Sequence, residues 1–316
     1  LFNKKGFELA APIIRLNSHE TLMLQFDDLD ADYKDYHYTI IHCNADWTPS
    51  RINPFDYLEG FTSDRVSEYA FSFNTRVPYT HYAIEFPNNN MRPRLSGNYV
   101  IRVFLNGDPD QVVLTRRFLV IEPRAVVSGR VSMANLIHVR DAMQQVSFTV
   151  NISGLSVSNP LRDIRTVVTQ NGRWDNAITN IQPRSVQGNQ LVYDHEETLL
   201  FEAGNEFRRF DIRSLRYSGE RVASLQAGTS HWDVFLQDDP VRASRRYTSD
   251  NDINGRFTIK NNDGRNDNLE SDYAWVHFSL PMSAPLYGAS VYVMGELSLW
   301  QFTERNRMIY NHRQNK

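Results

Sequence analysis

The feature that most constrains the fold is a hairpin signal between residues 97 and 121. Four apolar residues recur there at every second position: Tyr99, Ile101, Val103 and Leu105. Residues at this spacing share one face of an extended strand. The turn-forming run Asn106-Gly107-Asp108 follows, and residues 112–121 then supply a second strand-like segment. The pattern predicts two antiparallel strands with one buried face.

Similar strand signals recur along most of the chain. We expect further strands at residues 36–43, 145–152, 163–170, 191–193, 209–217, 231–236, 256–260, 273–280 and 289–295. Aromatic residues make up 12% of the chain, which favours strands. No segment fits an amphipathic helix of more than about three turns. Short strands separated by turns predict an all-β protein built from tandem antiparallel β-sandwich domains, of the immunoglobulin-like or early-set kind.

The length of 316 residues suits two or three such domains. Glu122-Pro123-Arg124 ends the hairpin, so we place a first β-sandwich domain at 1–123. A polar stretch at residues 261–268 predicts an exposed linker, which gives a second domain at 124–268. Residues 269–316 are too few for a sandwich of roughly a hundred residues. We therefore expect them to be the start of a third, truncated early-set-like domain.

Charge and cysteine content exclude several classes of protein. The net charge of −3 gives no reason to expect nucleic acid or an anionic membrane as the main partner. Cys43 is the only cysteine, so neither an internal disulfide nor a cysteine metal cluster can form. No run approaches the ~20 apolar residues of a membrane helix. The sequence begins at Leu1 without Met or a signal peptide, and we expect a mature or trimmed form.

The basic residues are mostly arginine. Five are lysine, which leaves 29 arginines among the 34 basic residues. The segment 204–217 interleaves four arginines with aromatic residues, and guanidinium groups both form bidentate pairs and stack on rings. One interpretation is a partner-binding row made of Arg208, Arg209, Arg213, Arg216 and Tyr217. The other is an ordinary strand that buries Phe210 and Ile212 and leaves Arg209 and Arg213 exposed beside acidic neighbours.

A second candidate for partner binding is the segment 170–176, which contains Arg173 and Trp174 beside amide side chains. Tryptophan next to arginine and amides is a common way to hold a sugar or a peptide. The alternative is a hairpin tip whose tryptophan packs into the core. Both interpretations stay open from the sequence.

A weak calcium candidate lies at Asp250, Asp252 and Asn254, because alternate oxygen ligands followed by Gly255 match the first half of a calcium loop. The twelfth position is Asn261, where such a loop has a bidentate glutamate. The alternative is a turn before the strand at 256–260.

His37 and His42 lie five residues apart and would face opposite sides of a strand, so we interpret them as ordinary strand residues. We find no nucleophile, carboxylate pair or phosphate loop with catalytic spacing, and we expect neither an enzyme nor a cofactor.

Seven stretches in chain order resemble the type IX secretion system plug proteins of Bacteroidota. They are residues 40–49, 78–82, 95–99, 114–118, 170–178, 204–217 and 252–257. The resemblance implies a periplasmic protein with tandem β-sandwich domains. Its implied partner is the giant outer-membrane β-barrel translocon of the type IX system, whose periplasmic opening it would seal when no substrate is engaged. It would not itself span the membrane.

The tail at residues 291–300 is similar to the start of early-set modules related to glycogen-binding domains, although Leu297-Ser298 replaces the usual Phe-Asn. Together with Trp174, Trp232 and Trp300, this supports a second hypothesis, an envelope carbohydrate-binding protein. A third hypothesis is an adaptor that hands substrates to the same translocon.

Overall fold

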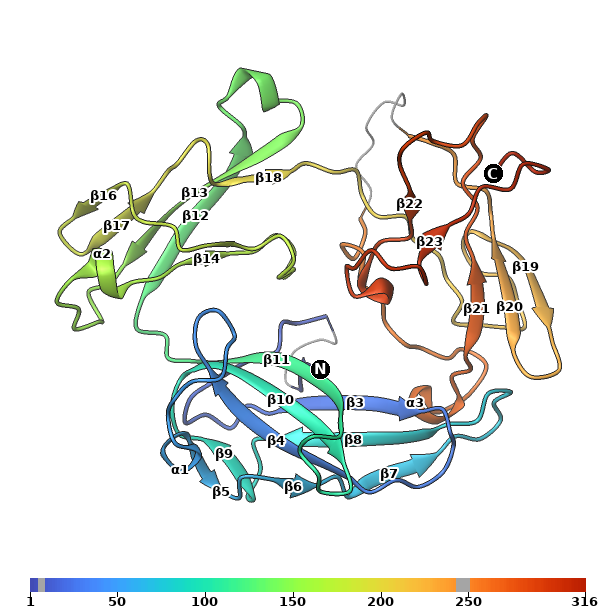
Figure 1. Cartoon of the computed structure of the whole chain (residues 1–316), viewed down its shortest axis with the longest axis horizontal. Coiled ribbons are helices and arrows are strands. Elements are labelled where there is room, and N and C mark those ends of the chain that lie inside the picture. The colour runs from blue at the N-terminus through green and yellow to red at the C-terminus, as the bar shows by residue number, and fades with distance from the viewer. Residues whose placement is uncertain (5–8, 243–250) are drawn as a thin grey trace.

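The chain folds into three β-rich units that lie around a common centre in the computed structural model (Figure 1). The structure describes residues 1–4, 9–242 and 251–316. Its sheets are mostly antiparallel, and the predicted all-β class of tandem β-sandwich domains is confirmed. Within the described residues, no helix combines the length and the apolar character that crossing a membrane requires.

The first unit is a sandwich of two sheets. One sheet has the order β1-β3-β8-β7, with bounds Phe2–Asn3, Leu22–Asp28, Thr80–Phe86 and Glu68–Phe71. The other has the order β2-β11-β10-β4-β6, with bounds Ile13–Arg15, Val112–Ile121, Gly97–Leu105, Tyr36–Cys43 and Asp64–Arg65. A short helix and a small ribbon complete the unit: α1 (Pro54–Tyr57), β5 (Leu58–Gly60) and β9 (Met91–Pro93).

The predicted hairpin is confirmed as β10 and β11, which pair antiparallel from Gly97↔Val120 onward. Asn106 (φ 54°) and Gly107 (φ 68°) take the left-handed conformation that the tight turn requires. Tyr99, Ile101 and Val103 are fully buried between the two sheets, as their spacing predicts. Because burying one large apolar side chain contributes roughly 1.5–3 kcal/mol, this face supplies much of the unit's stability.

The second unit has its own smaller core. Its sheet contains β12 (Val126–Met133), β13 (Met143–Asn151), β17 (Gln190–Tyr193), β16 (Ser185–Gln187) and β18 (Leu200–Glu202). The connecting elements are η1 (Ile137–Val139), α2 (Pro160–Asp163), β14 (Val167–Val168) and β15 (Ile178–Thr179). Phe148 stacks on Tyr193 with ring centroids 4.4 Å apart, and Leu191 and Leu199 are fully buried around them.

The third unit contains β19 (Val222–Ala227), β20 (Trp232–Leu236), β21 (Ala274–His277), β22 (Val291–Tyr292) and β23 (Arg307–Met308). It also contains α3 (Asp267–Glu270) and η2 (Glu296–Ser298). Strand β20 pairs in parallel with β21, so one sheet contains residues on both sides of the expected boundary at 268. Because β20 and β21 share a sheet, the boundary between the second and third units falls before β19. We propose that it lies near residue 203, just after β18 ends.

Two strand predictions are wrong: residues 209–217 and 256–260 form no strand. Side chains satisfy several of their backbone N–H groups in place of a neighbouring strand. Leu215 donates its N–H to Asp263 at 2.8 Å, and Tyr217 donates to the Ser214 hydroxyl at 3.1 Å. Phe257 donates to the Glu296 carboxylate at 3.2 Å. Local acceptors of this kind compete with a strand ladder for the same donors.

Candidate functional site

The loop between β14 and β15 brings the three units together. Asn171 (φ 56°) and Gly172 (φ 73°) supply the left-handed residues of its turn. Arg173 closes the turn by donating its N–H to the Gln170 carbonyl at 3.1 Å. The next residue, Trp174, therefore lies at the tip of the second unit. Figure 1 shows this hairpin reaching toward both of the other units.

Trp174 forms the junction between the first and second units. Its indole meets that of Trp47 edge to face, with ring centroids 4.8 Å apart. The Arg117 guanidinium lies over both rings, 4.7 Å from the Trp47 centroid and 5.7 Å from that of Trp174. An aromatic pair contributes about 0.5–1.5 kcal/mol and a cation–π contact about 0.5–1 kcal/mol. Of the two interpretations of this segment, one expected Trp174 in a core; the ring instead packs between two units, against Trp47 and Arg117.

Arg173 forms the junction between the second and third units. Its guanidinium lies 4.3 Å from the centroid of the Trp300 ring. The Asp175 carboxylate, 2.5 Å away, holds the guanidinium in place. Trp300 also meets Phe207 edge to face, with ring centroids 5.5 Å apart. Arg173 and Trp174, adjacent in sequence, thus contact two different units.

The first and third units are joined by the carboxylate of Asp272. It accepts the backbone N–H groups of Arg76 at 2.8 Å and Val77 at 3.1 Å, and the indole N–H of Trp232 at 3.2 Å. The Arg76 guanidinium also lies 4.8 Å from the Trp232 centroid. Hydrogen bonds to a charged group contribute about 1.5–3 kcal/mol each, so this contact is strong.

Two tyrosines reinforce the same junction. Tyr79 lies 3.0 Å from the carbonyls of both Asn268 and Ser271, and Tyr273 donates to Asp27 at 2.8 Å. Burial, followed by the charge of Asp27, raises the pKa of Tyr273. The hydroxyl therefore stays protonated and remains a donor at any physiological pH.

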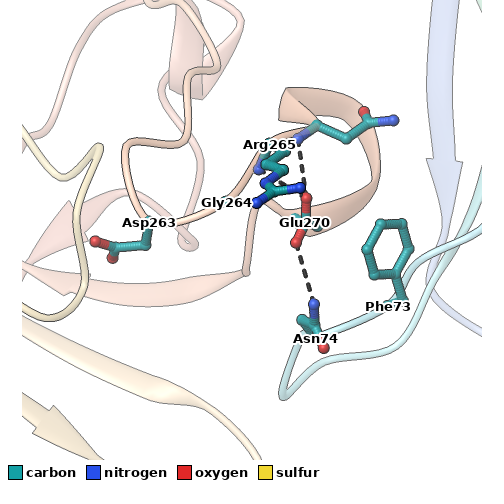
Figure 2. A pocket seen from close by; sticks show the side chains of 7 residues that line it. Phe73, Asn74, Asp263, Gly264, Arg265 and Glu270 are labelled. Carbon is teal, nitrogen blue, oxygen red and sulfur yellow. Dashed lines mark hydrogen bonds between the residues drawn. The ribbon is translucent and has the colours of Figure 1, made fainter.

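A polar hollow of about 740 Å³ lies at the edge of this junction. Figure 2 shows Phe73 and Asn74 on one loop facing Glu270 of α3. The Glu270 carboxylate accepts from the Asn74 amide at 3.1 Å and from the Arg265 backbone at 2.8 Å. Backbone donors, first among the causes, lower the pKa of Glu270. The carboxylate thus serves as a connector between loops.

The structure separates the five residues predicted for the partner-binding row. Arg208 pairs with Asp239, Arg209 with Glu220 at 2.9 Å, and Arg213 with Asp211. The predicted acidic neighbours of Arg209 and Arg213 are therefore present. Arg216 is exposed and forms no ion pair with a described residue. Tyr217 is 76% exposed.

The calcium candidate lies partly outside the described residues, because Asp250 is not among them. Asp252 accepts N–H groups from Phe207 and, at 3.0 Å, from Asn254. Arg256 donates its N–H to the Ile253 carbonyl at 3.1 Å, which makes this segment a turn. Across the part of the chain that the structure describes, no three His, Cys, Asp or Glu residues gather as metal ligands.

The three tryptophans of the carbohydrate hypothesis do not share a face. Trp174 packs on Trp47, Trp232 lies under Arg76, and Trp300 lies under Arg173. An arginine lies over one face of each of these three rings: Arg117 over Trp174, Arg76 over Trp232 and Arg173 over Trp300.

Sequence reasoning missed the residues that receive these contacts. Trp47, Arg117 and Asp272 were not among the candidate residues, although Trp47 follows a recognisable turn at Asn44-Ala45-Asp46. In that turn Trp47 takes a positive φ of 66° and donates its N–H to the Asn44 carbonyl at 3.0 Å. A positive φ is uncommon for a bulky residue, but it becomes visible only in the folded chain.

Comparisons with known proteins agree with the fold. A crystal structure of a hypothetical protein from Parabacteroides merdae, solved at 2.30 Å, superposes with a TM-score of 0.91 at 36% sequence identity. The match covers 98% of this chain and 78% of that one. No curated protein matches the sequence. Residues 1–122 match the family described as the first domain of the type 9 secretion system plug protein. The chain therefore belongs to the type 9 secretion system plug protein family, through the sandwich that forms its first unit.

Proposed function

We propose that this chain is a non-enzymatic plug subunit that seals the periplasmic opening of the giant outer-membrane β-barrel translocon. The observation that carries the proposal is the family match over residues 1–122, which relates the chain to the type IX secretion machinery. A wide aqueous barrel leaks solutes unless something blocks its lumen. The proposal places the protein in the periplasm, against the inner side of the outer membrane.

The junctions support an occluding role. Each unit contacts both of the others: Trp47 packs on Trp174, Arg173 lies over Trp300, and the Asp272 carboxylate accepts the backbone N–H groups of Arg76 and Val77. Contacts at all three junctions resist the hinge motions that are the default between domains joined by linkers. A body braced in this way suits a blocking role better than three independent modules would.

Within this proposal, Arg216 and Tyr217 are the residues of the Arg-rich segment that we expect to contact the barrel. Their side chains are exposed, whereas Arg208, Arg209 and Arg213 already hold carboxylates. Tyrosine and arginine are enriched among the few residues that contribute most of the binding free energy at protein interfaces.

The test is affinity purification of the tagged protein from its native envelope in mild detergent, followed by mass spectrometry. We expect a giant outer-membrane barrel in near-stoichiometric amount. The Tyr217→Ala variant should recover at least tenfold less barrel, because an interface anchor contributes about 2 kcal/mol or more. Tyr287→Ala is the matched control, since Tyr287 is fully exposed.

Deleting the gene provides an independent test. We expect the outer membrane to admit labelled dextrans that the wild type excludes, and periplasmic fractions to contain the protein in wild-type cells. Unchanged permeability together with recovery of the protein alone would refute the plug role.

A further inference from the structure

The β19-β20-β21 sheet of the third unit has an outer face whose residues follow from the strand register (Figure 1). Residues paired directly on neighbouring strands point to the same side of a sheet. Val234 is fully buried and pairs with Val276, so this row lies on the inner face. The residue that precedes Val234 is Asp233, which therefore lies on the outer face. It pairs with Trp275 on β21 and with Gln226 on β19, and these three residues form one outer row.

Trp275 supplies an open aromatic surface in this row. The residue is 67% exposed, and within the described residues neither an arginine nor a second ring lies over its indole, unlike the three tryptophans of the carbohydrate hypothesis. Strand β21 is the last strand of its sheet, so no strand flanks Trp275 on the far side. The face of an aromatic ring carries partial negative charge, which attracts the C–H groups on the face of a pyranose ring.

The Asp233 carboxylate lies beside Trp275 and is held by two histidines. His277 donates its Nε2–H at 2.8 Å, and Nε2 of His231 lies 3.3 Å from the other carboxylate oxygen. The His277 ring is in turn stacked on Phe235, with centroids 4.3 Å apart and planes at 9°. A carboxylate has about four lone-pair sites, so about two remain for a ligand. The acceptor is thus preorganised on a strand of the sheet.

The spacing of these groups suits a sugar. Neighbouring strands lie about 4.8 Å apart, a span comparable with one pyranose ring. A ring stacked on Trp275 therefore directs the hydroxyl groups at its edge toward Asp233, which can accept two adjacent ones. The Gln226 amide, exposed on the next strand, adds a donor and an acceptor to the same row.

The charge of the outer face favours a neutral ligand. Its paired residues contain one carboxylate and no lysine or arginine: Ser224, Gln226, Asp233, Phe235, Trp275 and His277. A phosphate or an acidic peptide would meet the negative charge of Asp233 without a cation to bind it. A quaternary ammonium ion is commonly held in a cage of several aromatic rings, whereas Trp275 presents a single open ring.

We infer that the outer row of Gln226, Asp233 and Trp275 binds a neutral, β-linked glycan chain. One pyranose ring stacks on the Trp275 indole, and two adjacent hydroxyl groups donate to the Asp233 carboxylate. A β-1,4-linked chain is an extended ribbon of flat rings, which matches a sheet face with an open edge. This binding site goes beyond the sealing role and does not depend on it.

The test is calorimetric titration of the 316-residue chain with cellohexaose and with N-acetylchitohexaose, two neutral β-1,4-linked oligomers. We expect at least one of them to bind. Trp275→Ala should weaken that binding roughly tenfold or more, because the stacking surface is lost. Asp233→Asn should weaken it to a similar extent, because an amide has one acceptor oxygen in place of two. Trp275→Phe keeps an aromatic face and should restore most of the affinity that Trp275→Ala loses.

Controls separate a specific site from a general effect of exposed rings. Phe55→Ala removes a ring that is 69% exposed on α1 of the first unit, and it should bind the oligomers like the wild type. Trp275→Ala should melt close to the wild-type temperature, because the ring is mostly in solvent.

Three results would each overturn the inference: no heat with either oligomer at millimolar concentration, equal affinity of Trp275→Ala and the wild type, or tighter binding of choline than of both oligomers. Because these experiments use no translocon, their failure leaves the plug role to its own tests.

Discussion

The indole rings of Trp47 and Trp174 meet edge to face, with centroids 4.8 Å apart and planes at 84°, across the junction between the first and second units. The residues lie far apart in sequence, in two turns that each contain a residue of positive φ. One Arg117 guanidinium covers both rings. The contact therefore depends on two loops and one strand holding their positions together.

Trp174→Ala should loosen the second unit without unfolding the first. Removing the ring eliminates the pair with Trp47 and the cation–π contact with Arg117, a loss of about 1–2 kcal/mol at this junction. Small-angle scattering should report a larger radius of gyration, and proteases should cut faster near residues 170–176. Trp275→Ala is the control, because Trp275 is 67% exposed and lies outside the junctions. Identical scattering of wild type and Trp174→Ala would mean that this pair does not brace the units.

Asp272→Ala should destabilise the junction between the first and third units by about 2–4 kcal/mol. The change leaves the N–H groups of Arg76 and Val77 and the indole N–H of Trp232 without their acceptor. Urea denaturation followed by tryptophan fluorescence measures the loss. Asp141→Ala removes an exposed carboxylate that has no hydrogen bond to a described residue, and it should change stability by less than about 0.5 kcal/mol. A similar small effect for Asp272→Ala would contradict the assigned role.

Gly255→Ala should disrupt the packing of Trp300. A Cβ at Gly255 would lie 2.7 Å from ring atoms of both Phe207 and Trp300, and the backbone has φ +72°. Gly288 offers a matched control, with φ +68° and open space around its Cβ position. Both variants incur the left-handed strain of about 1–2 kcal/mol, so the difference between them isolates the steric clash. We expect Gly255→Ala to melt at a clearly lower temperature; equal melting would exclude the clash.

Acid should weaken the first unit through Asp28. Burial alone would raise the pKa of this carboxyl, but hydrogen bonds from Lys34, the Asp30 backbone and Tyr36 outweigh burial and lower it. Because the folded pKa is lower than the unfolded value of about 3.9, the stabilisation is complete above that value. It is lost as pH falls through the folded pKa.

Asp28→Asn should therefore be less stable than the wild type at pH 7, by roughly 1–3 kcal/mol, with the gap closing below about pH 4. Thermal melts between pH 7 and pH 2 measure this difference. Asp141→Asn serves again as the exposed control. A gap that stays constant down to pH 2 would show that the charge of Asp28 does not contribute.

The sequence alone determined the class of fold and its best-formed strands. Alternation at Tyr99, Ile101 and Val103 predicted a buried face because strand geometry repeats every two residues. The Asn106-Gly107 turn fixed the hairpin because its left-handed residues leave few other conformations. These signals are local, so they can be recognised without knowing the rest of the molecule.

Only the tertiary structure decided which side chains meet. The segment 209–217 has strand-like composition, yet side chains satisfy several of its backbone N–H groups: Asp211 and Ser214 within the segment and Asp263 from elsewhere. Nothing in the sequence around Asp272 distinguishes this residue from other acidic residues. Its role arises because it accepts the N–H groups of Arg76 and Val77, almost two hundred positions away. The contacts of Trp47, Arg117 and Trp174 likewise depend on how folded units pack, because long-range contacts carry no periodic signal along the chain.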